Sequence, residues 1–162
     1  MRRIVKKLGC SVAGPYTHFK SQDDILSSLI ERGERDLTGD LKRAKDAGGE
    51  IFDMLKRIAV TYRDFARNNR ELHKLMFHIP GSEKVFRSAT ASYRVYLDAL
   101  RQGVKSGRLK FTKKGYHAMA RTMWAWLYGL IVLEMTGVTE QGQNFAFDDG
   151  FAVFQRLLEQ GE

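Results

Sequence analysis

Residues 51–65 have the sequence IFDMLKRIAVTYRDF, in which apolar side chains recur at helical spacing. Ile51, Leu55, Ile58, Tyr62 and Phe65 follow one another at intervals of four, three, four and three residues. Because an α-helix turns once in about 3.6 residues, this spacing places all five on one face. The segment is therefore predicted to form a helix that buries this face.

The same periodicity continues on both sides of this segment. Ser21 is a suitable helix cap with an acid three residues later at Asp24, so a helix is predicted to begin there and to end at Gly48-Gly49. Only two prolines, Pro15 and Pro80, interrupt the chain. Further helices are predicted at residues 69–77, 82–107, 112–135 and 145–158. The predicted fold class is all-α.

Length and composition restrict the class of protein. A chain of 162 residues with 43% hydrophobic residues fits one domain, or one domain with a small appendage, around a real core. The single cysteine, Cys10, excludes an intrachain disulfide and a cysteine zinc cluster and indicates a reducing compartment. The longest uncharged apolar run, residues 123–133, is too short to cross a membrane, and the N-terminus lacks a signal-peptide pattern. We therefore expect a cytoplasmic protein with no membrane partner.

Positive charge is concentrated at the N-terminus. The chain has a net charge of +8, and residues 1–20 contain five basic residues and no acid. A basic end can simply be solvated, but it also suits an acidic partner such as DNA. The local pattern favours the second interpretation, because Gly9 supplies a turn between a short amphipathic segment and a helix predicted to begin at Ser11 and run to Phe19. Two helices joined by a tight turn are typical of a helix-turn-helix.

The segment from Ile4 to Ser21, followed by Asp24-Ile25-Leu26, resembles the TetR family of bacterial regulators. The family pattern there is roughly I-A-x-x-A-G-V-S-x-x-x-[LP]-Y-x-[HY]-F-x-[ST]-K-[ED]-x-L. Further along, Trp124-Ala125-x-x-Tyr128-Gly129-Leu130 is similar to the W-x-x-x-H-G signature of one subgroup, with Tyr128 where histidine is usual. The resemblance implies a helix-turn-helix region with its connecting helix at residues 1–46 and a helical ligand-binding and dimerisation domain at 47–162.

The resemblance also implies that the DNA-binding region is N-terminally incomplete. Met1 falls where the family already has the interior of its second helix, so the first helix would lie upstream. We expect the natural protein to carry that segment, and we expect impaired DNA affinity without it.

In the family, a recognition helix enters the major groove of operator DNA. Its equivalent here is residues 12–19, where small side chains allow a close approach to base edges and neighbouring donors suit phosphates. For Tyr16 and Phe19 the alternative is packing in the core of the small domain, which we favour for Phe19. The predicted DNA-binding residues are Arg2, Arg3, Ser11, Val12, Ala13, Gly14, Tyr16, Thr17, His18 and Lys20.

The middle helices carry many aromatic and thioether side chains, which are typical either of an ordinary core or of a pocket for a small apolar or aromatic ligand. The resemblance implies a pocket that binds an inducer, with His73 or His78 as polar partners. The predicted ligand-binding residues are Tyr62, Phe65, His73, Met76, Phe77, Tyr93, Met123 and Trp126.

The last two predicted helices have more apolar surface than one core face requires. In the family this pair forms a four-helix interface with a second copy, and a palindromic operator requires a two-fold dimer. The alternative is that these residues belong to the core of a monomer. The predicted interface residues are Trp124, Leu127, Ile131, Phe147, Phe151 and Phe154.

No constellation typical of catalysis, of a metal site or of a cofactor site is found in the sequence. His73 and His78 are five residues apart without the spacing of a zinc pair, and no nucleophile or phosphate-binding motif accompanies them. The predicted function is a ligand-responsive homodimeric transcription regulator, a repressor released by a small molecule. The alternatives are a ligand-binding bundle without sequence-specific DNA binding and, less favoured, a helical enzyme.

Overall fold

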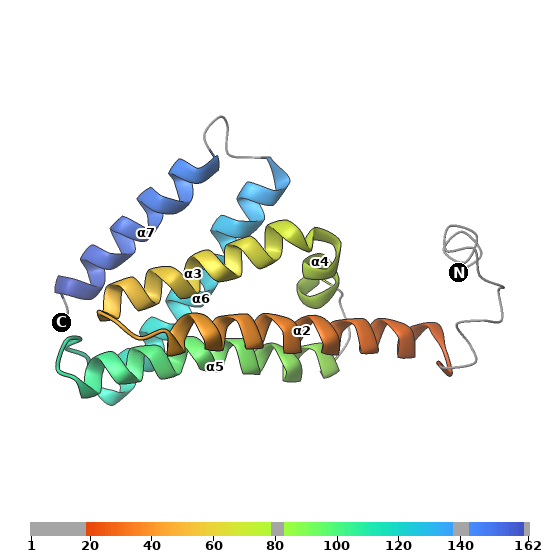
Figure 1. Cartoon of the computed structure of the whole chain (residues 1–162), viewed down its shortest axis with the longest axis horizontal. Helices are drawn as coiled ribbons and strands as arrows, with labels where there is room; N and C mark the ends of the chain where they lie inside the picture. Colours follow the sequence, from red (N-terminus) through yellow and green to blue (C-terminus); the bar gives the residue numbers. More distant parts are fainter. Residues whose placement is uncertain (1–18, 79–82, 138–142, 161–162) are drawn as a thin grey trace.

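The computed structural model describes residues 19–78, 83–137 and 143–160, and all regular secondary structure in these ranges is α-helical. The prediction of an all-α fold is confirmed. The helices are α2 (Gln22–Asp46), α3 (Ile51–Asn68), α4 (Arg70–His78), α5 (Glu83–Lys105), α6 (Lys113–Thr136) and α7 (Gln143–Gln160) (Figure 1).

The helix ends follow from local chemistry. The Ser21 side chain accepts a hydrogen bond from the backbone N–H of Asp24 at 3.1 Å, and this cap begins α2 as predicted. Thr112 caps α6 in the same manner through the N–H of Gly115, also at 3.1 Å. Gly137 ends α6 with a φ of 72°, a backbone conformation that side chains with a Cβ rarely adopt.

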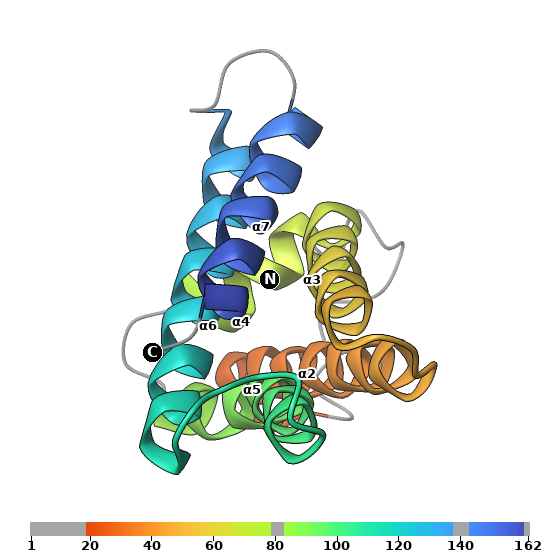
Figure 2. The same ribbon diagram turned by 90° about the vertical axis from the view of Figure 1, so that its left-hand side faces the viewer.

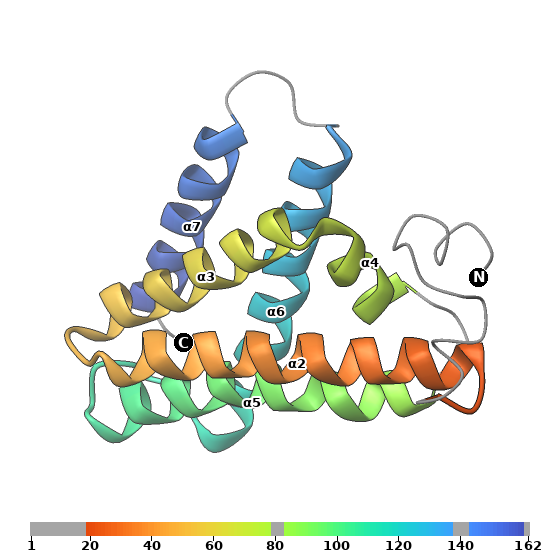
Figure 3. The ribbon, with the colours of Figure 1, turned by 45° about the vertical axis from the view of Figure 1, so that its right-hand side comes forward.

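Two layers of helices surround the core. Helices α2 and α5 run side by side, and the N-terminal end of α2 projects beyond the rest of the bundle (Figure 1). Helices α6 and α7 pair with each other and rise away from that layer (Figure 2). Helix α3 packs on α2, and the short α4 lies beside α2, close to α3 and α6 (Figure 3). The five-residue face predicted for residues 51–65 is buried, as expected.

No helix of the described segments is long and apolar enough to cross a membrane.

The C-terminal end of α5 packs closely on its neighbours at Gly103. A Cβ added at Gly103 would lie 2.6 Å from Leu109 Cδ1 and 2.9 Å from Ile51 Cγ1. Gly103→Ala is therefore expected to lower the free energy of unfolding by about 1–3 kcal/mol through overpacking, although alanine favours a helix. Gly39→Ala in α2 is the control, because the only atom within 4 Å of its added Cβ would be Arg43 Nη1, at 3.5 Å. This variant is expected to raise the free energy of unfolding by about 0.5–1 kcal/mol. Urea unfolding of both variants measures the difference, and equal effects would contradict the tight contact.

Candidate functional site

Seven ring side chains of the described residues gather where α3, α4, α5 and α6 meet. Their spacing explains this, because residues three or four apart on a helix share one face. We call this group the aromatic cluster. Its members are Tyr62 of α3, His73 and Phe77 of α4, Tyr93 and Tyr96 of α5, and Trp124 and Tyr128 of α6.

Tyr62 and Trp124 form the centre of the aromatic cluster. Their rings are stacked, with centroids 5.1 Å apart and planes inclined by 8°. The Tyr62 hydroxyl is hydrogen-bonded to Nε2 of His73 at 3.1 Å. The edges of Tyr93 and Tyr96 pack against the indole of Trp124, with centroids 6.0 and 5.5 Å away. The cluster thus combines flat apolar faces with a few polar groups, as pockets for small aromatic molecules do.

The aromatic cluster has a buried floor and a partly open rim. Tyr62, His73 and Tyr96 are fully buried. The other four rings, those of Phe77, Tyr93, Trp124 and Tyr128, are only half-buried. The rim is therefore the part of the aromatic cluster that solvent reaches.

A buried carboxylate of α2 lies next to the aromatic cluster. Glu34 Oε1 accepts hydrogen bonds from the backbone N–H and the hydroxyl of Ser92 on α5, at 3.0 and 2.9 Å, and a longer one from Thr38 at 3.5 Å. Ser92 is adjacent to Tyr93 and one helical turn before Tyr96. Burial is the largest cause of the raised pKa of Tyr62, and the charges of Tyr128 and then of Glu34 raise it further. The Glu34 carboxylate therefore lies near the floor of the aromatic cluster.

Burial raises the pKa of both floor tyrosines well above their ordinary value of 10.0. Tyr62 and Tyr96 therefore keep their phenolic protons at physiological pH. They act as hydrogen-bonding hydroxyls in this site.

A buried ion pair between Arg63 and Glu134 joins α3 to α6, and Arg63 also contacts α7. Arg63 forms a two-pronged contact with Glu134, with Nε–Oε2 and Nη2–Oε1 distances of 2.9 and 3.2 Å. Arg67 adds a contact to the same carboxylate at 3.4 Å, and the Arg63 guanidinium lies 4.8 Å from the ring centre of Phe147. Two arginines thus compensate the charge of Glu134.

The family of the chain is shown by sequence comparison. Residues 55–160 match the family model described as "Tetracyclin repressor-like, C-terminal domain", which covers most of the chain and all the residues of the aromatic cluster. The chain belongs to the TetR family. A search of curated proteins found no significant match.

Solved structures show the same TetR fold. A protein with unknown function from Rhodococcus sp. RHA1 is similar with a TM-score of 0.83 and 25% identity, over 98% of this chain and 84% of that one. The putative regulatory protein SCO4313 gives 0.76 and 20%, over 96% and 84%. The TetR family transcriptional regulator PfmR from Thermus thermophilus gives 0.72 and 18%, over 97% and 85%.

The ligand-binding residues predicted for this TetR chain are brought together only in part. Tyr62, His73, Phe77 and Tyr93 are members of the aromatic cluster. Phe65, Met76 and Met123 are buried core residues. The side chain of His78 lies outside the described residues.

The two tryptophans occupy positions opposite to those predicted. Trp124 was expected at a dimer interface and instead stacks on Tyr62. Trp126 was expected in the ligand site and instead stacks on Phe154 of α7, with centroids 5.3 Å apart. Two residues are separated by about 200° on a helix, so the two indoles point to opposite sides of α6.

The other five predicted interface residues lie inside the chain. Leu127 and Ile131 of α6, and Phe147, Phe151 and Phe154 of α7, are each at most 4% exposed. They pack in the core of this chain, so they offer almost no surface to a second copy. Among the side chains of α6 and α7 that the structure describes, the exposed large apolar ones are Leu133, Val153 and Leu157.

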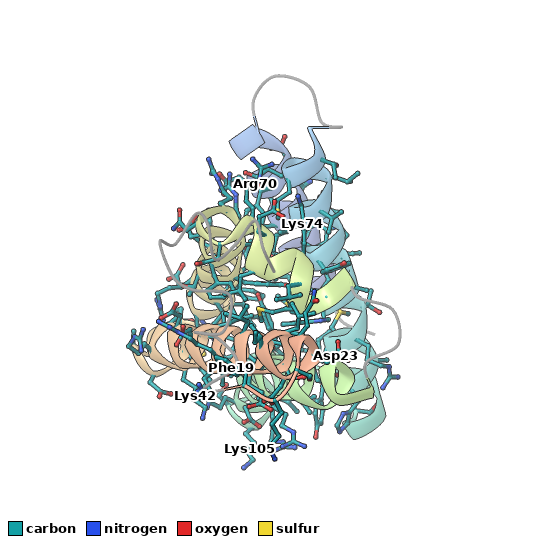
Figure 4. All side chains as sticks on the ribbon, turned by 90° about the vertical axis from the view of Figure 1, so that its right-hand side faces the viewer. Phe19, Asp23, Lys42, Arg70, Lys74 and Lys105 are labelled. Atoms are coloured by element: carbon teal, nitrogen blue, oxygen red, sulfur yellow. The ribbon has the colours of Figure 1, made fainter. Side chains whose placement is uncertain are left out.

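Of the predicted DNA-binding residues, only Lys20 lies within the described part of the chain. Arg2, Arg3 and residues 11–18 lie outside the described residues. Lys20 is exposed just before α2, where its backbone N–H donates to Asp24 Oδ2 at 2.9 Å. In Figure 4, Phe19 and Asp23 mark this end of α2, while Arg70 and Lys74 of α4 lie higher in the view. The role of Lys20 at a phosphate stays a prediction.

Sequence reasoning missed Glu34, although a signal was present. Ile30, Leu37 and Leu41 are buried at helical spacing on α2, and Glu34 is the acid within that stripe. Tyr96 and Tyr128 were also missed, and their contacts depend on how α5 and α6 pack.

The two floor tyrosines should differ in what their hydroxyls contribute. Tyr62→Phe removes the hydrogen bond to His73 and is expected to lower the free energy of unfolding by about 1–3 kcal/mol. The Tyr96 hydroxyl is buried without a hydrogen-bond partner among the described residues, so Tyr96→Phe is expected to be neutral or to stabilise by up to about 1 kcal/mol. Chemical denaturation compares the two, and an equal loss in both would contradict the assigned hydrogen bond.

Glu34 should make stability depend on pH. Burial raises the pKa of its carboxyl above the ordinary value of 4.5, and the hydrogen bonds from Ser92 and Thr38 oppose the rise. The folded state therefore binds the proton more tightly than the unfolded chain. The stability contributed by this proton is fully present below pH 4.5 and is lost as the pH rises through the folded pKa.

Glu34→Gln is the matched variant for this effect, because it keeps the shape and cannot titrate. We expect the melting temperature of the wild type, relative to Glu34→Gln, to fall as the pH rises from about 4.5 through the folded pKa. A constant difference between the two proteins over this range would contradict the raised pKa.

Proposed function

We propose that this protein is a homodimeric transcription regulator that binds operator DNA and releases it when a small molecule binds, acting as a repressor. The observation that carries the proposal is the family match over residues 55–160. The basic N-terminal residues with helix-turn-helix spacing support the DNA partner. The aromatic cluster supports the ligand, because it offers flat apolar faces and a partly open rim.

Helix α2 supplies the physical link between the two activities. It follows directly on the predicted recognition segment and is the helix that carries Glu34. Its Gly33 packs so closely on α4 that an added Cβ would lie 2.7 Å from Met76 Sδ, while Glu34 bonds to Ser92 of α5. A ligand that shifts α4 or α5 therefore also acts on α2. It changes DNA affinity to the extent that it binds the shifted arrangement of these helices more tightly than the arrangement that binds DNA.

The two-fold dimer is supported by exposed apolar side chains on α6 and α7. Leu133, Val153 and Leu157 are 40–54% exposed, and a Cβ added at Gly129 of α6 would meet nothing within 4 Å. An apolar surface on a helix pair suits the isologous contact of two identical copies. Two copies would present two recognition segments to the two halves of a palindrome.

Selection from a pool of random duplex DNA tests the proposed function. The protein expressed from its complete natural gene is expected to enrich an inverted repeat. Lys20→Ala should weaken binding to that repeat, whereas Lys105→Ala, which removes a charge from the C-terminal end of α5, should not. Failure to enrich any sequence, with ligand binding intact, would favour the alternative of a ligand-binding bundle without sequence-specific DNA binding.

A further inference from the structure

The two buried carboxylates of the described residues have different partners. Glu134 is compensated by Arg63 and Arg67. Glu34 is equally buried, at 6% against 7% exposed, yet no salt bridge of the described residues includes it. A buried carboxylate without a cation is costly, so a positive group brought by a ligand would be strongly favoured there.

The hydrogen bonds of Glu34 leave one of its oxygens available. The Ser92 N–H, the Ser92 hydroxyl and the Thr38 hydroxyl all donate to Oε1. Among the described residues, none donates a hydrogen bond to Oε2. The three donors hold the carboxylate in place on α2 and α5, which orients it before any ligand arrives.

A second polar group of the same region lacks a partner. The Tyr96 hydroxyl is fully buried and forms no hydrogen bond with the residues that the structure describes. It lies on α5 one turn after Ser92, the residue that holds Glu34. Buried hydroxyls are nearly always satisfied, so this one suits a polar atom supplied by a ligand.

The rings of the aromatic cluster favour positive charge over negative charge. Trp124 contacts Tyr62, Tyr93 and Tyr96, and the faces of phenol and indole rings attract cations. An aromatic anion would be repelled by Glu34, and a neutral molecule would leave its charge uncompensated.

We propose that the aromatic cluster and Glu34 form a site for a small hydrophobic cation, an arylalkylamine whose ammonium group contacts Glu34 and whose ring stacks in the cluster. The inference rests on the proposed function in taking the cluster as the ligand site. It adds the chemical class of the ligand and assigns Glu34 as the residue that selects it.

Isothermal titration calorimetry with three molecules of similar shape tests this class. The probes are 2-naphthylmethylamine, which is a cation at neutral pH, 2-naphthalenemethanol, which is neutral, and 2-naphthoate, which is an anion. The amine is expected to bind at least about tenfold more tightly than the alcohol, and the anion more weakly than both. Equal affinities, or no binding of the amine at about 1 mM, would overturn the proposal.

The variant Glu34→Gln tests the assignment of the residue. It is expected to weaken binding of the amine at least about tenfold and to leave binding of the alcohol unchanged. Asp36→Asn is the control, because Asp36 is an exposed acid on the same helix, and it should change neither. An unchanged amine affinity in Glu34→Gln would overturn the assignment. The charge preference of the wild type is measured independently, so a variant that fails to fold does not remove the test.

The outcome is separable from that of the proposed function. Amine binding that depends on Glu34, without selection of any DNA sequence, would support the site and contradict the regulator. Selection of an operator by a protein with no preference for the amine would contradict only the ligand class.

Discussion

Replacing Glu134 with leucine is expected to lower the free energy of unfolding by about 3–5 kcal/mol. The substitution deprives the buried Arg63 guanidinium of a carboxylate that contacts it at 2.9 and 3.2 Å. The contact of Arg63 with Phe147 remains, but a cation–π interaction does not replace a buried ion pair. Because these residues join α3, α6 and α7, the loss should appear in the cooperative unfolding of the whole bundle, measured by urea denaturation.

The double variant Arg63→Met with Glu134→Leu is the control for this interpretation. Removing both charges avoids burying an arginine that has lost this carboxylate, so the double variant is expected to recover most of the lost stability. Arg67→Ala should cost less, about 1 kcal/mol or below, because its side chain is 45% exposed and solvent screens the contact. A double variant as unstable as Glu134→Leu alone would show that the residues matter for packing and not for charge pairing.

Leu157→Arg is expected to convert the proposed dimer to a monomer. Leu157 is 54% exposed on α7, and a two-fold contact would place an arginine from each copy in the interface. We expect dimer dissociation to increase at least about 100-fold and operator affinity to fall with it, because a monomer contacts only one half-site. Analytical ultracentrifugation and DNA titration of the same samples measure both effects.

Leu29→Arg is the matched control for the dimer prediction. Leu29 is also an exposed leucine, at 43%, but it lies near the N-terminal end of α2. It should leave the proposed dimer intact. If Leu29→Arg dissociates the protein and Leu157→Arg does not, the interface lies elsewhere than on α6 and α7.

The fold was predictable because the signals for helices act over a few residues. Ser21 and Asp24 begin α2, and the paired glycines Gly48 and Gly49 follow its end with positive φ. The helical spacing of Ile51 to Phe65 identified the buried face of α3 correctly. None of these features depends on what packs against them.

The candidate site was predictable only in part, since a buried face does not reveal what covers it. The stripe of Phe147, Phe151 and Phe154 was correctly identified as apolar, yet it packs within this chain and not on a second copy. On α6, both Trp124 and Trp126 lie in an almost uniformly apolar segment, so periodicity could not decide which one faces α3. Contacts such as Glu34–Ser92, 58 residues apart, are set by tertiary packing.

Fluorescence anisotropy with the DNA upstream of the protein's own coding region tests the central claim most directly. The protein should be expressed from its complete natural gene and titrated at two salt concentrations against random competitor DNA. The account predicts saturable binding that survives the competitor and weakens moderately with salt. Binding that the competitor removes, or that modest salt abolishes, would reflect only the charge of the basic N-terminus and would contradict a sequence-specific regulator.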